Sequence, residues 1–413
     1  MPILRYKQET LREMSMSDNG SRETRAPIKI ADRVSSSLGV SRKWVITGTV
    51  ALALVSAFSL VAYFGHFAPG SEALTNDSAS NDKPVFQVTE TLRHKGIVTE
   101  LAWSPDGKLL ATTGILNPQI SLWDTQTGQL VRALTREAGA GNQLAFTRDG
   151  QYLLSSAAKK NTGAALTLWD VKTGEIANQI AGTFPEKDPI YNAARVFALD
   201  PEQKLLALVA EKRGTIVLYD AQNWRTAGTL STGSDIAIAL TIAPGAKWLA
   251  AGTAGGKILL FDLDTREQVR TIDAYGAEGA GVESLAFSPD GQFIASGQSI
   301  AMMHRGPDGK FYNYVITDPI RIWKRDDGTR TQSFGGPLGP VRGLAWSPDG
   351  QYLASGNSDR TVRVWRVDSA GMGAVVTTFP RGSAFAVEFS PDGRRLAAVG
   401  ANMAIVSEFK SAK

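Results

Sequence analysis

Short apolar runs alternate with polar turns along most of the chain after residue 85. The turn SPDG occurs four times, at 104–107, 288–291, 347–350 and 390–393. Runs such as QYLASG and VRVWRV are rich in Val, Leu, Tyr and Trp, which favour strands. The turn closes a hairpin because proline fixes one backbone angle and glycine tolerates positive φ. The pattern therefore predicts an all-β region built from repeated hairpins.

The hairpins recur with a regular period. An apolar or aromatic residue stands just before each turn or its degenerate copy, and these seven anchors are Trp103, Phe146, Leu199, Ile242, Phe287, Trp346 and Phe389. The steps between them are 43, 53, 43, 45, 59 and 43 residues. A period of about 40–45 residues is typical of a four-stranded propeller blade. The spacing predicts seven blades, and stacking between blades explains why the strands are apolar on both faces.

A second motif follows most anchors by about twenty residues, and it pairs an aromatic residue with an acid: Trp123-Asp124, Trp169-Asp170, Tyr219-Asp220 and Phe261-Asp262. Trp323-Lys324 and Trp365-Arg366 keep the aromatic residue and change the acid. Over residues 85–413 the chain resembles the WD-repeat β-propeller family, and we interpret its repeats as bacterial-type repeats of a membrane-anchored member. The resemblance implies a seven-bladed propeller. It is blurred in blades 3 and 4, where DPEQ (200–203) and APGA (243–246) replace SPDG.

The two ends of the repeat region complement each other. Residues 85–92 (VFQVTETL) are typical of an outermost blade strand, and His94-Lys95-Gly96 follows as at a blade boundary of the family. The run 403–409 (MAIVSEF) is typical of a third strand without a fourth. We predict that 85–92 supplies the missing strand and closes the ring, which removes an open sheet edge.

An uncharged stretch precedes the repeats. No Asp, Glu, Lys or Arg occurs from Trp44 to Ser71, and twenty residues of helix rise about 30 Å, the thickness of a bilayer core. The alternatives are a buried helix or a cleaved signal peptide, but the basic segment before it is long for a signal peptide. We therefore predict a transmembrane α-helix over 44–67, after a flexible basic tail at 1–43 and before a linker at 68–84.

Charges around this stretch predict its orientation. Residues 1–43 hold nine Lys/Arg and five Asp/Glu, whereas 68–92 hold four acids and one lysine. Positive flanks stay in the cytoplasm, so the tail is expected inside and the propeller outside, in the periplasm of a bacterium. Small residues recur every four positions in the span, where they permit packing against a partner helix: Thr49, Ala53 and Ala57.

Composition excludes several classes of protein. The chain has 413 residues and no cysteine, so it has neither disulfides nor thiolate metal sites. The net charge of +4 equals that of residues 1–43, since 9 minus 5 is 4, and residues 44–413 are neutral. A neutral body argues against broad nucleic-acid binding, which requires a basic face.

Three connections are longer than a blade requires: 157–165 in blade 2, 182–195 before blade 3, and 298–320 in blade 5. The resemblance places all three on the face called the top, which commonly binds partners in the family. The blade 5 insertion is expected to form a hairpin around residues 306–309. Its arms carry Met302, Met303, Phe311, Tyr312 and Tyr314, with Arg305 and Lys310 as a polar rim. These side chains either form a protein interface or pack back onto the propeller.

One variable residue near the start of each inner strand surrounds the top of the channel: Thr99, Asn142, Arg195, Ile238, Glu283, Arg342 and Phe385. The resemblance implies that this ring contacts partners. Its mixed charge suits a protein or peptide, with Arg195 and Arg342 the strongest candidates by residue type. The alternative is that these arginines pair with Glu283 and nearby acids.

Candidate chemistry is sparse. Met302, Met303 and His304 include copper-ligand types, but adjacent side chains in a strand point to alternate faces, so no metal site is predicted. The sequence contains no P-loop, Rossmann glycine pattern or Ser-His-Asp order. We therefore predict a non-catalytic, cofactor-free scaffold that binds protein partners to assemble or stabilise a membrane or envelope complex. The alternatives are a periplasmic propeller enzyme or a ligand sensor using the central channel.

Overall fold

A computed structural model of the chain describes residues 85–115, 119–135, 143–159, 163–181, 197–210, 214–276, 280–301, 304–305, 311–312, 318–337, 339–367 and 374–410. The chain divides into two units, Met1–Phe67 and Ala68–Lys413, and every described residue belongs to the second. The predicted tail, membrane helix and linker lie outside the described residues. Among the residues that the structure does describe, no helix is long and apolar enough to cross a membrane.

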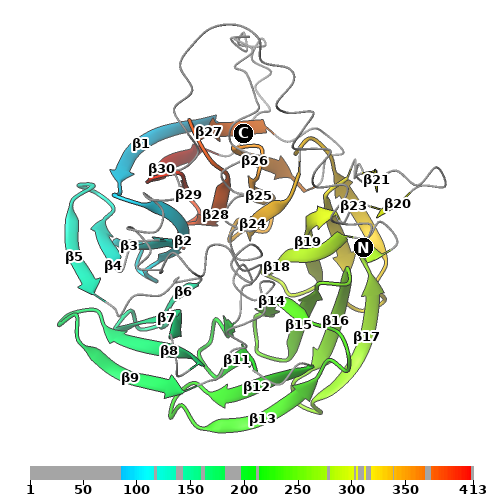
Figure 1. The fold of residues 1–413 in the computed structure, drawn as a ribbon. Coiled ribbons are helices and arrows are strands. Elements are labelled where there is room, and N and C mark those ends of the chain that lie inside the picture. The colour runs from blue at the N-terminus through cyan, green and yellow to red at the C-terminus, as the bar shows by residue number, and fades with distance from the viewer. Residues whose placement is uncertain are drawn as a thin grey trace, which may run out of the picture. The chain divides into compact units, whose positions relative to one another are not determined.

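The second unit is a ring of seven four-stranded antiparallel sheets (Figure 1), which confirms the predicted propeller. Blade 1 contains β2 (Ile97–Trp103), β3 (Leu109–Ile115), β4 (Gln119–Asp124) and β5 (Leu130–Thr135). Blade 2 contains β6 (Leu144–Phe146), β7 (Tyr152–Lys159), β8 (Gly163–Asp170) and β9 (Ile176–Ala181). Blade 3 contains β10 (Phe197–Leu199), β11 (Leu205–Val209), β12 (Thr215–Asp220) and β13 (Thr226–Ser231).

The remaining blades follow the same order from the inner to the outer strand. Blade 4 contains β14 (Ala237–Ile242), β15 (Trp248–Thr253), β16 (Lys257–Asp262) and β17 (Glu267–Asp273). Blade 5 contains β18 (Ala280–Phe287), β19 (Phe293–Ala301), β22 (Ile320–Lys324) and β23 (Arg330–Phe334). Blade 6 contains β24 (Val341–Trp346), β25 (Tyr352–Asn357), β26 (Thr361–Arg366) and β27 (Ala374–Thr378).

Blade 7 is assembled from both ends of the described chain. It contains β28 (Ala384–Phe389), β29 (Arg395–Gly400), β30 (Met403–Lys410) and β1 (Val85–Arg93). The first strand runs antiparallel to β30 from Val85↔Lys410 to Arg93↔Met403, and the blue and red ribbons lie side by side in Figure 1. The N-terminal strand thus supplies the outer strand that the C-terminal run lacked, and the ring has no open blade.

Each anchor residue is the last residue of an inner strand, and the turn after it has a fixed hydrogen-bond pattern. In blade 1, Ser104 Oγ donates to Asp106 Oδ1 at 2.7 Å and accepts from the Leu109 N–H at 2.8 Å. Gly107 follows with φ +68°, a conformation that glycine adopts without strain. The motif recurs because every blade must turn back at the same place, on the face that we call the bottom.

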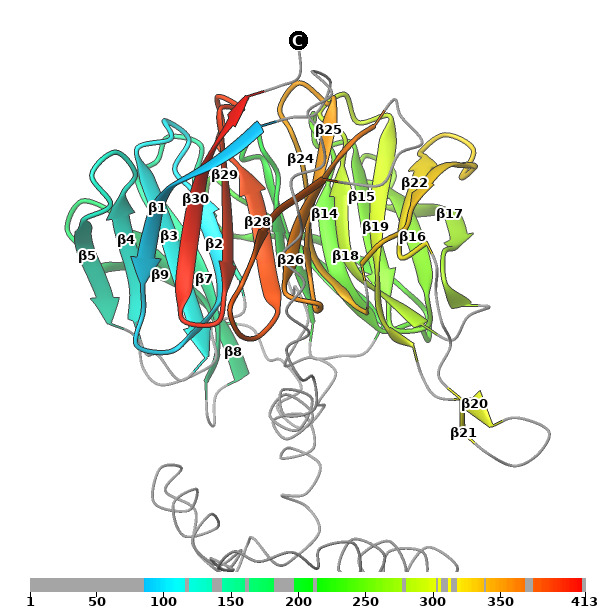
Figure 2. The same ribbon diagram turned by 90° about the horizontal axis from the view of Figure 1, so that it is seen from above.

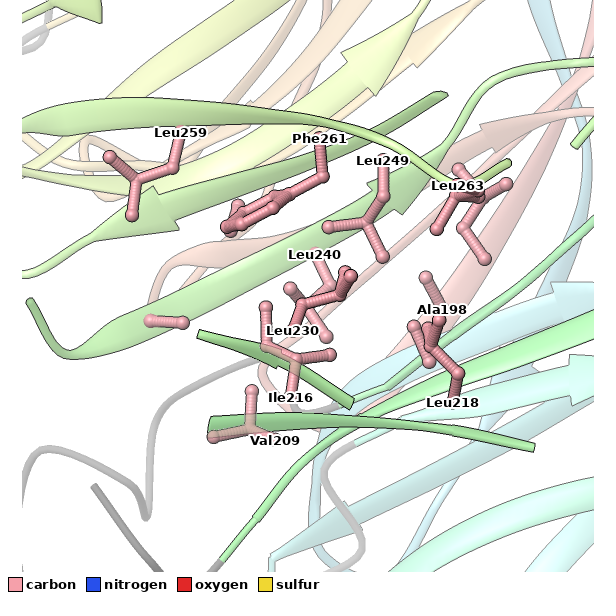
Figure 3. Packing of buried hydrophobic residues seen from close by; sticks show 14 residues of the cluster. Ala198, Val209, Ile216, Leu218, Leu230, Leu240, Leu249, Leu259, Phe261 and Leu263 are labelled. Carbon is pink, nitrogen blue, oxygen red and sulfur yellow. The ribbon is translucent and has the colours of Figure 1, made fainter. Parts of the chain in front are cut away.

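Neighbouring blades bury aliphatic side chains between them. Figure 3 shows such a core between blades 3 and 4, where Ile216 and Leu218 pack with Leu249 and Phe261. All four are 0–1% exposed, and full burial of one such side chain contributes about 1.5–3 kcal/mol. The central strands are therefore apolar on both faces because each face meets a different blade.

Candidate functional site

The blade 5 insertion forms the predicted hairpin. Its strands are β20 (His304–Arg305) and β21 (Phe311–Tyr312), paired as His304↔Tyr312 and Arg305↔Phe311. The hairpin stands clear of the ring in Figure 2. Met302, Met303, Lys310 and Tyr314 lie outside the described residues, as do the side chains of Arg305, Phe311 and Tyr312. Whether these side chains form an interface or pack back onto the propeller stays a prediction.

The stem of the insertion, residues 318–321, contains a partly buried ion pair. Asp318 lies two residues before β22, and its carboxylate accepts from Arg321 Nη2 at 3.0 Å and from Arg330 Nη1 at 3.1 Å. The Arg321 side chain is 6% exposed and lies over the Tyr275 ring, 4.6 Å from its centroid. Removing Asp318 would leave the buried Arg321 charge without this partner, which is destabilising, so the network stabilises the returning end of the insertion.

Tyr275 joins the same stem from the preceding blade boundary. Its hydroxyl shares its single hydrogen between the Ser296 carbonyl at 2.9 Å and the Pro319 carbonyl at 3.0 Å. The Trp323 indole N–H donates to Ser296 Oγ at 2.9 Å. Tyr275 is fully buried. The Tyr275 hydroxyl and the Trp323 indole N–H are both hydrogen-bonded, so the core beneath the insertion leaves neither donor unsatisfied.

The equivalent network in blade 1 contains the histidine of the blade boundary. His94 Nε2 lies 3.3 Å from Thr112 Oγ1, which accepts from the Trp123 indole N–H at 2.8 Å. The His94 and Trp123 rings meet edge to face, with centroids 5.1 Å apart. Burial lowers the pKa of His94 to about 4, because desolvation disfavours the charged imidazolium. The geometry therefore gives His94 a structural role in blade 1, as a partner of Thr112 and Trp123.

Two of the predicted ring residues pair with each other. Arg342 Nη1 donates to Glu283 Oε1, and Arg342 Nε donates to Ser358 Oγ at 3.1 Å. The side chains are 19% and 12% exposed. The sequence left two roles open for Arg342, contact with a partner or pairing with Glu283, and the structure shows the pairing. Arg195 lies outside the described residues, so its role stays a prediction.

Further ion pairs on the top face had no recognisable sequence signal. Lys257 Nζ lies 3.2 Å from Asp235 Oδ2 in blade 4, and Arg363 Nη2 lies 3.4 Å from Asp359 Oδ2 in blade 6. The first pair joins residues 22 positions apart, and the second joins residues four positions apart at the turn between β25 and β26. Together with Glu283 and Arg342, they give the top of blades 4 to 6 a mixed polar surface.

The central channel is lined by all seven inner strands and encloses about 500 Å³. Its polar groups serve the ring itself: the Glu388 carboxylate accepts from the Trp103 N–H at 3.2 Å, and Gln143 Oε1 accepts from the Phe197 N–H at 2.9 Å. No group of three His, Cys, Asp or Glu side chains that could hold a metal ion occurs in the described part of the ring. The channel polar groups therefore connect neighbouring blades.

Two family models match parts of the chain. The family described as "WD domain, G-beta repeat" matches residues 266–300 and 328–366. The family described as "Anaphase-promoting complex subunit 4 WD40 domain" matches residues 78–147. The matched segments include all of blade 1, strands β18, β19 up to residue 300 and β23 of blade 5, and strands β24 to β26 of blade 6.

Similar proteins are distant in sequence. The serine-threonine kinase receptor-associated protein of Gallus gallus is 23% identical over 319 residues, covering 75% of this chain and 78% of that protein. The small ribosomal subunit protein RACK1 of Schizosaccharomyces pombe is 24% identical, covering 66% and 95%. A chain in a crystal structure of the mitotic checkpoint complex has a TM-score of 0.61 at 18% identity, covering 84% of this chain and 97% of its own length. At that identity the structural likeness shows the fold alone.

Proposed function

Since this chain is a WD-repeat β-propeller protein, we propose that it is a non-catalytic scaffold that binds protein partners through its top face. The Gallus gallus relative is named for its association with a receptor, and the Schizosaccharomyces pombe relative as a ribosomal subunit protein. The structural neighbour comes from a checkpoint complex. Each name describes an association or an assembly, which supports a binding role for this chain.

The stem of the blade 5 insertion is the observation that carries the proposal. A blade closes without such a segment, since β15 and β16 are joined directly by residues 254–256. Yet buried Arg321 pairs with half-buried Asp318, so the returning end of the insertion is attached to blade 5. Its methionine and aromatic residues belong to types enriched in interfaces: Met302, Met303, Phe311, Tyr312 and Tyr314. Arg305 and Lys310 would form the polar rim.

The channel ring extends this surface. Glu283 and Arg342 form a partly exposed pair, and a charged pair at the edge of an interface favours one partner orientation over others. We place Arg195 in the same surface, because its position in the repeat matches that of Glu283 and Arg342.

The site of action in this proposal is the outer side of a cytoplasmic membrane. The uncharged stretch at 44–67 would anchor the chain, with the N-terminus in the cytoplasm and the propeller in the periplasm. Thr49, Ala53 and Ala57 would pack against a partner helix. The support is the basic flank before the stretch and the acidic flank after it, an asymmetry that sets membrane orientation. The complex would then be a membrane or envelope complex.

The test is purification of the full chain from detergent-solubilised membranes, beside a variant in which 301–314 is replaced by a two-residue turn. We expect the variant to keep its melting temperature and to lose its partners. Phe311→Ala with Tyr312→Ala should weaken binding by roughly 2–4 kcal/mol if both are hot spots. A shortened chain that folds and retains every partner would refute the interface, and one that unfolds would show that the hairpin packs on its own propeller.

A further inference from the structure

A groove lies between blades 5 and 6, toward the bottom face. It encloses about 760 Å³, which is within the size range of specific ligand sites. Half-buried Phe293, Trp346 and Val367 contribute apolar surface, and exposed Lys324 and Arg366 stand beside them. The groove can therefore take an apolar side chain and place charged groups next to it.

At two other junctions, from blade 1 to blade 2 and from blade 4 to blade 5, an arginine crosses the corresponding space. Arg132 on the outer strand of blade 1 donates to the carbonyls of Lys172 and Thr173, both at 2.8 Å, in the last turn of blade 2. Arg270 on the outer strand of blade 4 donates to the carbonyls of Asp326 and Asp327 in blade 5, at 2.6 and 3.1 Å. In both places the arginine stem covers the junction between the blades.

Blade 5 has a glutamine at this position. Gln332 lies opposite Ile322 in the ladder of β22 and β23, just as Arg132 lies opposite Leu122 and Arg270 opposite Leu260. Glutamine is shorter and carries no charge. Its Oε1 is buried and has no hydrogen-bond partner among the described residues. The groove thus contains a buried acceptor that an incoming N–H would satisfy.

The two basic residues of the groove also depart from the sequence of the repeat. Lys324 and Arg366 follow Trp323 and Trp365, at the position where an aspartate follows the aromatic residue in blades 1 to 4. The backbone confirms the equivalence, because the Gly328 N–H donates to the Lys324 carbonyl at 2.9 Å as the Gly128 N–H donates to the Asp124 carbonyl. Both basic replacements line this one groove.

Two acids also line the groove, but they belong to the turn motif. Asp290 Oδ1 accepts from the Ser288 hydroxyl and the Gln292 N–H, and Asp349 Oδ1 accepts from Ser347 and Gln351 in the same way. Such a turn aspartate is also present in blades 1, 2 and 7. What distinguishes this groove is therefore its pair of cations, beside a buried glutamine oxygen at a position that blades 1 and 4 fill with arginine.

We propose that the groove between blades 5 and 6 is a second docking site, which binds an extended acidic segment of a partner protein. A leucine, isoleucine or phenylalanine of the segment packs on Phe293 and Trp346. An aspartate or glutamate within two residues of it pairs with Lys324 and Arg366, since carboxylates form charge-assisted hydrogen bonds with these groups. A backbone N–H of the segment donates to Gln332 Oε1.

The experiment selects a phage-displayed library of random twelve-residue peptides on the full chain in detergent. Counter-selection uses the variant Lys324→Asp with Arg366→Asp, which restores an acid after each tryptophan. A second variant, Gln332→Arg, restores the arginine of blades 1 and 4. Arg342→Ala, on the top face, is the control that leaves the groove intact. Melting temperatures establish that each variant is folded, and fluorescence polarisation gives the affinity of each selected peptide.

We expect the selected peptides to share an acid within two positions of a large apolar residue. Their affinity should fall at least tenfold in the double variant and in Gln332→Arg, and stay within twofold in Arg342→Ala. The proposal is overturned if no peptide distinguishes the folded variants from the original chain. It is also overturned if the peptides that do so lack acids, because the cations then have no role in recognition.

Discussion

Single residues explain why the turns recur even where the motif is degenerate. In blade 3, Asp200 replaces the serine, and its carboxylate accepts from the N–H groups of Glu202 and Lys204, both at 3.0 Å. The fourth residue of the turn must still adopt positive φ. Gln203 and Ala246 do so at 58° and 54° in blades 3 and 4, where other blades use glycine. The fold has tolerated two strained turns.

The strain predicts a stabilising substitution. Ala246→Gly should raise the free energy of unfolding by roughly 0.5–1 kcal/mol, because glycine adopts the left-handed conformation without a Cβ clash. The matched change is Gly350→Ala at φ +71°, where the added Cβ has room, 3.7 Å from Pro289 Cδ. Gly350→Ala should lower the free energy of unfolding by about 1–2 kcal/mol. Denaturant unfolding followed by tryptophan fluorescence measures both, and equal effects of the same sign would contradict the strain.

His94 predicts a pH dependence of stability. Its pKa is about 4 in the fold and about 6.5 in an unfolded chain. Between these values the unfolded state binds more protons, so the free energy of unfolding should decrease as the pH falls from about 6.5 to 4. His94→Gln should flatten this slope in unfolding curves measured across that range. An unchanged slope would show that His94 is not desolvated.

At the scale of elements, the closing strand is the part on which the ring depends most. Phe86 on β1 packs against Phe409 on β30, with ring centroids 5.0 Å apart. Phe409 in turn meets Tyr352 of blade 6 edge to face at 4.9 Å. Leu92 is 3% exposed. The strand therefore joins blade 7 to its neighbour through an aromatic cluster as well as through the backbone ladder.

Loss of this strand has a measurable cost. Burial of half-buried Phe86 and fully buried Leu92 contributes roughly 2–4 kcal/mol, so residues 94–413 should melt about 3–6 °C below residues 85–413. The shorter chain also exposes the edge of β30, which invites aggregation. Calorimetry and light scattering would detect both effects. Equal melting temperatures would mean that the ring is stable without its closing strand.

The elements were largely predictable, whereas the contacts between them were not. The anchors from Trp103 to Phe389 mark the ends of all seven inner strands, because the turn after each one has a local sequence signal. The Glu283–Arg342 pair joins residues 59 positions apart, and the role of Gln332 appears only when its ladder position is compared with Arg132. Such features depend on register and blade order, which no short stretch of sequence encodes.

At the scale of the molecule, the two faces of the ring have different surfaces. The top face carries the blade 5 insertion and the Glu283–Arg342 pair. The groove beside Lys324 and Arg366 lies toward the bottom, near the turns. A scaffold with two such surfaces can hold two partners at once without competition between them. Loss of the insertion should then leave binding in the groove intact.

Site-specific photo-crosslinking in intact membranes tests the central claim most directly. A benzophenone side chain is placed at Phe311 or Ser358 on the top face, and at Gln203 or Ala246 on the bottom turns of blades 3 and 4. We predict crosslinks to the same partner protein from both top positions and none to it from the two bottom positions. Crosslinks from the bottom turns alone would contradict the assignment of the top face, and no crosslink to any protein from the top positions would contradict the scaffold role.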